Sequence, residues 1–141
     1  MDIYLEFISN HSLLFIALLF VIILLLQSFF SDITRKYKLI SPSEAINLIN
    51  REDAVVIDTR TKDEFKSGHI SGAVLMPISE IKDNADALNK YEERPLILYC
   101  KSGTRSDEAC KTLSKLGRTN VHALSGGVQA WEAASMPLVK K

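Results

Sequence analysis

The sequence predicts an α/β fold with a mainly parallel sheet, preceded by one apolar helix near the N-terminus. Three observations predict this arrangement. Segments 54–58 and 95–99 are short apolar runs without polar alternation, which is typical of strands covered on both faces. Helical patterns separate these runs, as in the βα alternation of a parallel sheet. An unbroken apolar stretch also fills residues 13–26.

The apolar stretch is long enough to cross a membrane. A helix of roughly 18 residues rises about 27 Å, close to the thickness of a hydrocarbon core. A cleaved signal peptide has a positive N-terminal region, whereas this chain carries Asp2 and Glu6 there and no Lys or Arg. We therefore expect residues 8–30 to contact membrane lipid as a retained anchor. A signal peptide and a buried or interfacial helix are the alternatives.

Basic residues predict the orientation of this anchor. Arg35, Lys36 and Lys38 directly follow the apolar stretch, and such residues favour the cytoplasmic side. The sequence thus predicts a single-pass protein with its N-terminus outside and its domain in the cytoplasm, as would suit a bacterial inner membrane. The formal net charge of the chain is zero, which gives no indication of nucleic-acid binding.

Two segments organise the chain. Residues 1–38 hold the anchor and a short polar connector, and residues 39–141 form one domain of typical size. Because the chain has only two cysteines, Cys100 and Cys110, and a predicted cytoplasmic domain, we expect no structural disulfide.

The first half of the domain alternates helices and strands. Residues 41–44, Ser-Pro-Ser-Glu, have the pattern of a capping box and predict a helix to about residue 50. A strand at 54–58, a helical turn near 62–66 and a brief strand at 73–76 follow.

The second half repeats the alternation. Ile81, Ala85 and Leu88 share one face of a predicted helix that precedes the strand at 95–99. The later elements are an amphipathic helix with Ala109, Cys110, Leu113 and Leu116 on its apolar stripe and Gly117 at its end, a strand at 120–124, a turn at 125–127 and a helix at 128–134.

The segment after the strand at 95–99 has the composition of a reactive thiol site. It reads Cys100, Lys101, Ser102, Gly103, Thr104, Arg105 and Ser106. A helix N-terminus, converging backbone N–H groups and a nearby cation each lower a thiol pKa from its ordinary value of about 8.5. We therefore expect Cys100 to be a nucleophilic thiolate that acts on an anionic or sulfur-bearing substrate.

Several motifs besides this loop occur in a recognisable order. They are Val-Ile-Asp-Thr-Arg at 56–60, Glu-Phe at 64–65, Gly-His-Ile-Ser-Gly-Ala at 68–73, Leu-Ser-Gly-Gly at 124–127 and Ala-Trp at 130–131. With them, residues 39–138 resemble the single-domain rhodaneses, a family of sulfurtransferases. The resemblance implies a rhodanese-like three-layer fold, with a five-stranded parallel sheet flanked by helices and a catalytic cysteine between a strand and a helix.

Loop length distinguishes two chemistries of this fold. The spacing from Cys100 to Arg105 is C-x4-R, which in the family suits sulfur transfer, whereas similar phosphatases use C-x5-R, where this chain has Ser106. A smaller ring of N–H groups fits the single outer sulfur of a persulfide better than a phosphate. The sequence favours sulfur over phosphate.

These features predict a covalent mechanism. The Cys100 thiolate takes a sulfane sulfur from thiosulfate or a persulfide and passes it to a thiol or another nucleophile, of a small molecule or a partner protein. The backbone N–H groups of residues 101–105 are expected to point at the bound sulfur. No metal or other cofactor is required.

Three cations are candidates for substrate binding, each with an alternative. For Arg105 the expected role is electrostatic, and the alternative is that it merely covers the start of the helix. For Lys101 the alternatives are contact with substrate and simple solvation. The resemblance places Arg60 near the mouth of the site, where it would hold an anionic substrate. The alternative for Arg60 is a structural ion pair with Asp58 or Glu64.

Other residues are predicted to be structural. Cys110 is expected in the core, His69 in a buried hydrogen bond and Trp131 in helix packing. The main alternative function is a membrane-tethered binding module, or a persulfide carrier with little turnover.

Overall fold

The computed structural model describes residues 1–33 and 35–140 and contains two compact units, Met1–Arg35 and Lys36–Lys141. The first unit consists of α1 (Asp2–Asn10) and α2 (Ser12–Ile33), which are separated at His11. The expectation of one apolar span over residues 8–30 is therefore corrected, because residues 8–10 belong to α1.

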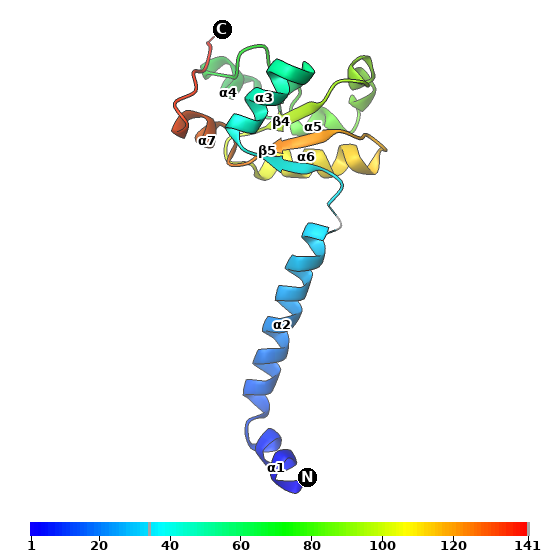
Figure 1. The fold of residues 1–141 in the computed structure, drawn as a ribbon, viewed down its shortest axis with the longest axis vertical. Coiled ribbons are helices and arrows are strands. Elements are labelled where there is room, and N and C mark those ends of the chain that lie inside the picture. Colours follow the sequence, from blue (N-terminus) through cyan, green and yellow to red (C-terminus); the bar gives the residue numbers. More distant parts are fainter. Residues whose placement is uncertain (34, 141) are drawn as a thin grey trace. The chain divides into compact units, whose positions relative to one another are not determined.

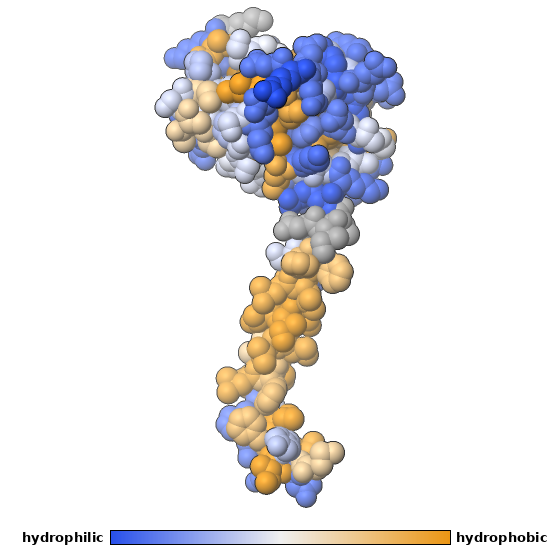
Figure 2. Space-filling view, viewed as in Figure 1, coloured by the Kyte–Doolittle hydropathy of each residue, from blue (hydrophilic) through white to orange (hydrophobic). Residues whose placement is uncertain are grey.

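The helix α2 has the length and composition of a membrane span. Its window Ser12–Phe30 is strongly apolar, a property that membrane spans share with signal sequences near an N-terminus. Figure 2 shows the exposed side of α2 as a hydrophobic surface, in contrast to the mostly hydrophilic surface of the folded domain.

The second unit contains a five-stranded parallel sheet, which confirms the predicted fold class. Its strand order is β1-β5-β4-β2-β3. The strands are β1 (Lys38–Ile40), β2 (Val55–Asp58), β3 (Val74–Leu75), β4 (Leu96–Tyr99) and β5 (Val121–Leu124). The edge strand β1 is an addition, since the sequence pattern assigned Lys38 to the connector.

Helices lie on both faces of this sheet (Figure 1). They are α3 (Pro42–Glu52), α4 (Lys62–Ser67), α5 (Ile78–Ile81), the 3-10 helix η1 (Ala85–Tyr91), α6 (Thr104–Lys115) and α7 (Gly127–Ala133). The predicted capping box of α3 is present, because Ser41 Oγ accepts from the Glu44 N–H while the Glu44 carboxylate accepts from the Ser41 N–H.

Two helical predictions need correction. The single helix expected through Ile81 and Leu88 is divided into α5 and η1, although both side chains are buried as predicted. Leu116 was expected on the apolar stripe of α6, but it follows the end of that helix and is 55% exposed.

Strand β4 runs through the middle of the core. Its Leu96 and Leu98 pack on one face with Leu113 of α6, whereas Ile97 and Tyr99 pack on the other face. Because all four residues of β4 are buried, the strand is fixed on both sides and ends directly before Cys100. The carboxyl ends of parallel strands are the usual place for a binding site in such a sheet.

Candidate active site

The loop from Cys100 to α6 wraps its own backbone around the cysteine sulfur. Gly103 precedes α6 and has a φ of +107°, a conformation that favours glycine. Its N–H donates to the Cys100 Sγ at 3.0 Å. Gly103 has no side chain that could cap α6, so the sulfur serves as an acceptor at this helix N-terminus.

Ser106 completes the surroundings of the sulfur. It is fully buried in the first turn of α6, its Oγ lies 3.6 Å from the Cys100 Sγ, and its hydroxyl donates to the Gly103 carbonyl at 3.0 Å. Burial raises the pKa of the Cys100 thiol, but hydrogen bonds from Ser106, Gly103 and Ser102 outweigh this effect, so the pKa lies below its ordinary value. The loop therefore stabilises a thiolate.

Helix α7 holds the loop from outside. The N–H of Val128 donates to the Cys100 carbonyl at 2.8 Å, and the N–H of Gln129 donates to the Lys101 carbonyl at 3.2 Å. In a trans peptide the N–H points opposite to the carbonyl, so the N–H groups of Lys101 and Ser102 point away from α7. Gly127 makes this approach possible, because a Cβ there would lie 2.3 Å from the Cys100 carbonyl oxygen.

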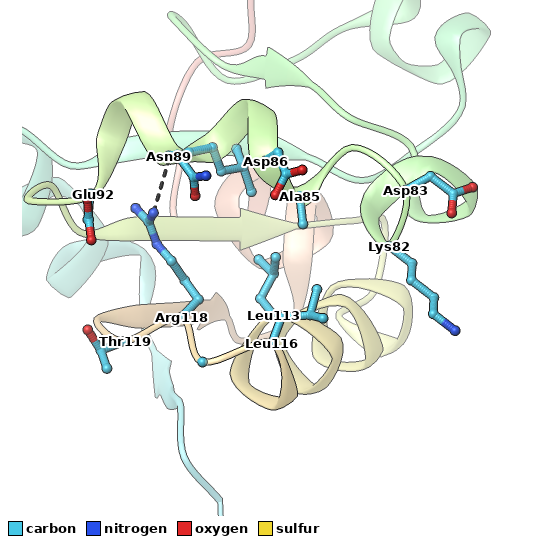
Figure 3. A pocket seen from close by; sticks show the side chains of 12 residues that line it. Lys82, Asp83, Ala85, Asp86, Asn89, Glu92, Leu113, Leu116, Arg118 and Thr119 are labelled. Carbon is cyan, nitrogen blue, oxygen red and sulfur yellow. Dashed lines mark hydrogen bonds between the residues drawn. The ribbon is translucent and has the colours of Figure 1, made fainter.

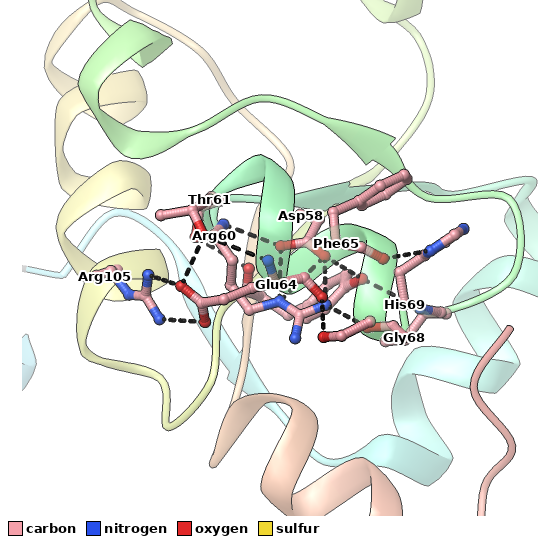
Figure 4. Close-up of polar contacts among 12 residues, drawn as sticks. Asp58, Arg60, Thr61, Glu64, Phe65, Gly68, His69 and Arg105 are labelled. Carbon is pink, nitrogen blue, oxygen red and sulfur yellow. Dashed lines mark hydrogen bonds and ion pairs between the residues drawn. The ribbon is translucent and has the colours of Figure 1, made fainter. Parts of the chain in front are cut away.

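Arg105 is engaged by a carboxylate of α4. Its two terminal nitrogens lie 2.9 and 3.0 Å from the two carboxylate oxygens of Glu64, as Figure 4 shows. Hydrogen bonding to Arg105 lowers the pKa of Glu64 to about 2. The hydrogen bonds to Glu64, and to a lesser extent its charge, raise the pKa of Arg105. Arg105 is thus paired with Glu64, which offsets much of its charge, and its electrostatic role toward the sulfur stays a prediction.

The structure does not place Arg60 at the mouth as an anion-binding group. Arg60 is 5% exposed, with its Nη2 2.7 Å from an Asp58 carboxylate oxygen and 2.6 Å from the Gly68 carbonyl oxygen. The Tyr99 hydroxyl donates to the same carboxylate at 2.7 Å. This buried network is the structural ion pair that was the alternative for Arg60, and it joins the ends of β2 and β4 (Figure 4).

The remaining predicted site residues belong to the loop and the first turn of α6. Lys101, Ser102 and Thr104 are exposed. No ion pair joins Lys101 to a carboxylate in the described part of the chain, and its contact with an anionic substrate stays a prediction. Of the backbone N–H groups expected to face the sulfur, those of Ser102 and Gly103 contribute to its lowered pKa. For residues 101, 104 and 105 this role stays a prediction.

Sequence reasoning missed four residues of the site. Three of them stood in the family motifs, but no role at the sulfur was assigned to any: Ser106 marked the loop length, Glu64 was a possible partner of Arg60, and Gly127 and Val128 were a turn and a helix start. The paired glycines after β5 were the available signal for Gly127, because glycine at a strand end often marks a close backbone approach. Nothing local marks Ser106 as a partner of the sulfur.

The residues predicted to be structural are confirmed as such. Cys110 is in the core, where burial raises its pKa. His69 is buried with its Nδ1 2.9 Å from the Phe65 carbonyl oxygen, and Trp131 packs in the second core cluster. Within residues 1–33 and 35–140, no group of three His, Cys, Asp or Glu side chains is arranged to hold a metal ion.

A cavity of about 360 Å³ lies between η1 and the end of α6 (Figure 3). Arg118 extends along it, and its Nη1 donates to the Leu88 carbonyl at 3.1 Å. No residue of the cysteine loop lines this cavity, and no cysteine does. It is therefore separate from the candidate active site.

Comparison with known proteins agrees with the geometry. The rhodanese-like domain family matches residues 41–134. Over 136 residues, 96% of this chain and 95% of its own length, the uncharacterized protein YibN of Escherichia coli is 38% identical. Thiosulfate sulfurtransferase GlpE of Coxiella burnetii is 31% identical over 97 residues, which are 69% of this chain and 89% of GlpE. A rhodanese-related protein from Thermoplasma volcanium superposes with a TM-score of 0.67 at 28% identity, covering 74% of this chain and all of that one. The chain belongs to the family of rhodanese-like domains.

Proposed function

We propose that this protein is a sulfurtransferase that moves a sulfane sulfur from thiosulfate or a persulfide to a thiol or another nucleophile through a persulfide on Cys100. The observation that carries the proposal is the contact from the Gly103 N–H to the Cys100 Sγ at 3.0 Å, inside a C-x4-R loop. The likeness to GlpE, which is named a thiosulfate sulfurtransferase, supports the same chemistry.

The first step loads the cysteine. The Cys100 thiolate attacks the outer sulfur of thiosulfate, a new S–S bond forms, and the S–S bond of the donor breaks so that its electron pair leaves with sulfite. With a persulfide donor the leaving group is a thiolate. The negative charge moves from Sγ to the transferred sulfur, where loop N–H groups and Arg105 stabilise it.

The second step regenerates the enzyme. A thiolate acceptor attacks the outer sulfur of the Cys100 persulfide, takes that sulfur, and returns the electron pair to Sγ as the thiolate. No external oxidant or reductant enters either step. Cyanide replaces the thiol acceptor in an assay and leaves as thiocyanate.

We also propose that α2 anchors this chemistry to a membrane in a single pass, with the folded domain on the cytoplasmic side of a bacterial inner membrane. The apolar window Ser12–Phe30 and the basic residues after it support this assignment. The acidic residues of the N-terminus favour a retained anchor over a cleaved signal.

A binding module or slow persulfide carrier is the second candidate. The observation that favours it is the burial of Cys100, which is 1% exposed. A sulfur enclosed to this degree admits small donors more readily than large acceptors. Turnover separates the two candidates, because a carrier accepts sulfur but releases it slowly.

The test uses the full chain in detergent with thiosulfate and cyanide. We expect thiocyanate formation by the wild type and by Cys110→Ala, and loss of activity in Cys100→Ser. Intact mass after thiosulfate alone is expected to rise by one sulfur atom, on the peptide that contains Cys100. Sulfur loading without turnover would favour the carrier, and absence of loading would contradict both the enzyme and the carrier.

A further inference from the structure

The N-terminal helix α1 has a polar face and a wider apolar face. At 100° per residue, the four polar residues of Asp2–Asn10 fall within an arc of about 100° and the apolar residues occupy the opposite arc of about 200°. The polar residues are Asp2, Glu6, Ser9 and Asn10, and the apolar residues are Ile3, Tyr4, Leu5, Phe7 and Ile8.

The apolar face of α1 is uncovered. Its five large apolar side chains are between 45% and 80% exposed, and no residue of α1 is buried. Among the side chains that the structure describes, a ring pairing links α1 to α2 between Phe7 and Phe15, whose centroids lie 6.3 Å apart. A nine-residue helix is marginal in water, and contact of its apolar face with a non-aqueous surface would stabilise it.

A break at His11 sets α1 apart from α2. His11 has a φ of −121° and a ψ of 27°, outside the helical range, and its N–H ends α1 by donating to the Phe7 carbonyl at 3.1 Å. The path of the chain bends there, so α1 does not continue the axis of α2 (Figure 1).

The length of α2 leaves no need for α1 in the hydrocarbon core. The apolar window of α2, which has 19 residues from Ser12 to Phe30, rises about 28 Å and already spans nearly all of a core of about 30 Å. The helix α1 therefore begins where α2 leaves the hydrocarbon. The two carboxylates on one face of α1 would be costly to bury among acyl chains. The five apolar side chains on the other face would be costly to expose to bulk water.

We propose that α1 is an interfacial helix that lies along the surface of the membrane that α2 spans, with Phe7 and its apolar neighbours toward the acyl chains and Asp2 and Glu6 toward water. The proposal rests on the proposed anchoring by α2. Because α1 carries no Lys or Arg, its contact with the bilayer is apolar and needs no anionic lipid.

The test places a single fluorescent label in the full chain, in a Cys100→Ser and Cys110→Ala background. Phe7→Cys and Ser9→Cys report the two faces of α1, and Val21→Cys reports the middle of α2. Each protein carries an environment-sensitive dye and is reconstituted in phosphatidylcholine vesicles. Quenchers are iodide in the water and nitroxide lipids of shallow or deep position.

We expect the label at position 7 to be quenched by the shallow nitroxide and protected from iodide at least fivefold relative to position 9. The same contrast is expected after addition of phosphatidylglycerol or 0.5 M NaCl. Equal iodide access at positions 7 and 9 would overturn the interfacial assignment, as would deep quenching at both. A label at position 21 that resists the deep nitroxide would show that the anchor itself is wrong, which overturns the proposal by a separate route.

Discussion

The hydroxyl of Ser106 lies where it can exchange partners as the thiol ionises. It donates to the Gly103 carbonyl while Cys100 is a thiol, and rotation about its C–O bond lets it donate to the thiolate. A hydrogen bond to a charged group stabilises that charge by about 1.5 kcal/mol or more. We therefore predict that Ser106 influences the reactivity of Cys100 by stabilising its thiolate.

The Ser106→Ala variant is expected to raise the pKa of Cys100 by about one unit, since one unit corresponds to about 1.4 kcal/mol. Alkylation by iodoacetamide rises with pH as the thiolate forms, so its midpoint reports this pKa. The wild-type midpoint should lie below the ordinary thiol value, and Ser106→Ala should move it upward. Ser102→Ala, which removes an exposed hydroxyl, is the control. An unchanged midpoint in Ser106→Ala would refute this role.

The Gly127→Ala variant is expected to disrupt the loop without touching its side chains. The added Cβ would lie 2.3 Å from the Cys100 carbonyl oxygen in a left-handed backbone, so we expect a loss of unfolding free energy on the order of 3 kcal/mol, together with most sulfur transfer. Urea unfolding and thiocyanate formation measure the two effects.

Gly117→Ala is the matched control for that variant. Gly117 also has a positive φ, but a Cβ there meets no atom within 4 Å, so only about 1–2 kcal/mol of backbone strain is expected. Equal losses in Gly127→Ala and Gly117→Ala would mean that backbone strain, rather than contact with the loop, determines the effect.

Some residue roles can be predicted from neighbours in the sequence, whereas others depend on contacts that only the fold creates. Cys100, Gly103 and Arg105 stand in one short segment, so their meeting was predictable. The roles of Arg60 and Glu64 depend on which carboxylate each arginine reaches in space. Sequence spacing allowed Arg60 to form an ion pair with either Asp58 or Glu64. In the fold Arg60 pairs with Asp58, and Glu64 pairs with Arg105.

Elements α4 and α6 are joined at the active site by the pair of Glu64 and Arg105. The folded pKa of Glu64, about 2, lies below the value of 4.5 for a free carboxyl group. Its contribution to stability is therefore complete above about pH 4.5 and is lost as the pH falls toward 2. Both side chains are partly exposed, which limits the contribution to below about 1 kcal/mol.

The Glu64→Gln variant is expected to be less stable than the wild type at pH 6 and equal to it near pH 2. Urea midpoints measured across this range check the convergence, with the exposed Glu80→Gln as the control. A difference between Glu64→Gln and the wild type that persists at pH 2 would show that packing, and not the charge of Glu64, stabilises the bridge.

The boundaries of the helices and strands show where sequence patterns predict secondary structure and where they do not. The capping box of α3 and the apolar run of β4 act through neighbours in sequence, and both were predicted. The strand β1 has one buried residue, Ile40, and therefore lacks an apolar run. The single helix expected through Ile81 and Leu88 ends at Ile81, before Asp83 and Asn84, which are residue types that favour turns over helix interiors.

At the scale of the whole molecule, the folded unit begins earlier than the sequence indicated. Residues 39–141 were expected, but β1 starts at Lys38, and Tyr37 before it is buried with its hydroxyl bonded to Asp107 of α6. The unit that holds the site together is Lys36–Lys141.

A fragment that begins at residue 41 is accordingly expected to lose on the order of 5 kcal/mol relative to one that begins at residue 36, because Tyr37 and Ile40 no longer fill the core. That is a large part of the stability of a typical domain. Unfolding in urea, followed by Trp131 fluorescence, measures the difference. Equal midpoints for the two fragments would show that β1 is dispensable.

Helix α7 follows the cysteine loop in the sequence, so during synthesis the loop forms before the helix that holds it in place. The ribosome releases α2 first, then the cysteine, and only afterwards the helix whose N–H groups hold the carbonyls of Cys100 and Lys101. Under the proposed membrane anchoring, a nascent chain would engage a bilayer before α7 closes on the loop, while the Cys100 thiol is still ordinary. Under the proposed sulfur transfer, incomplete translation products would therefore be bound to the membrane but unable to load sulfur.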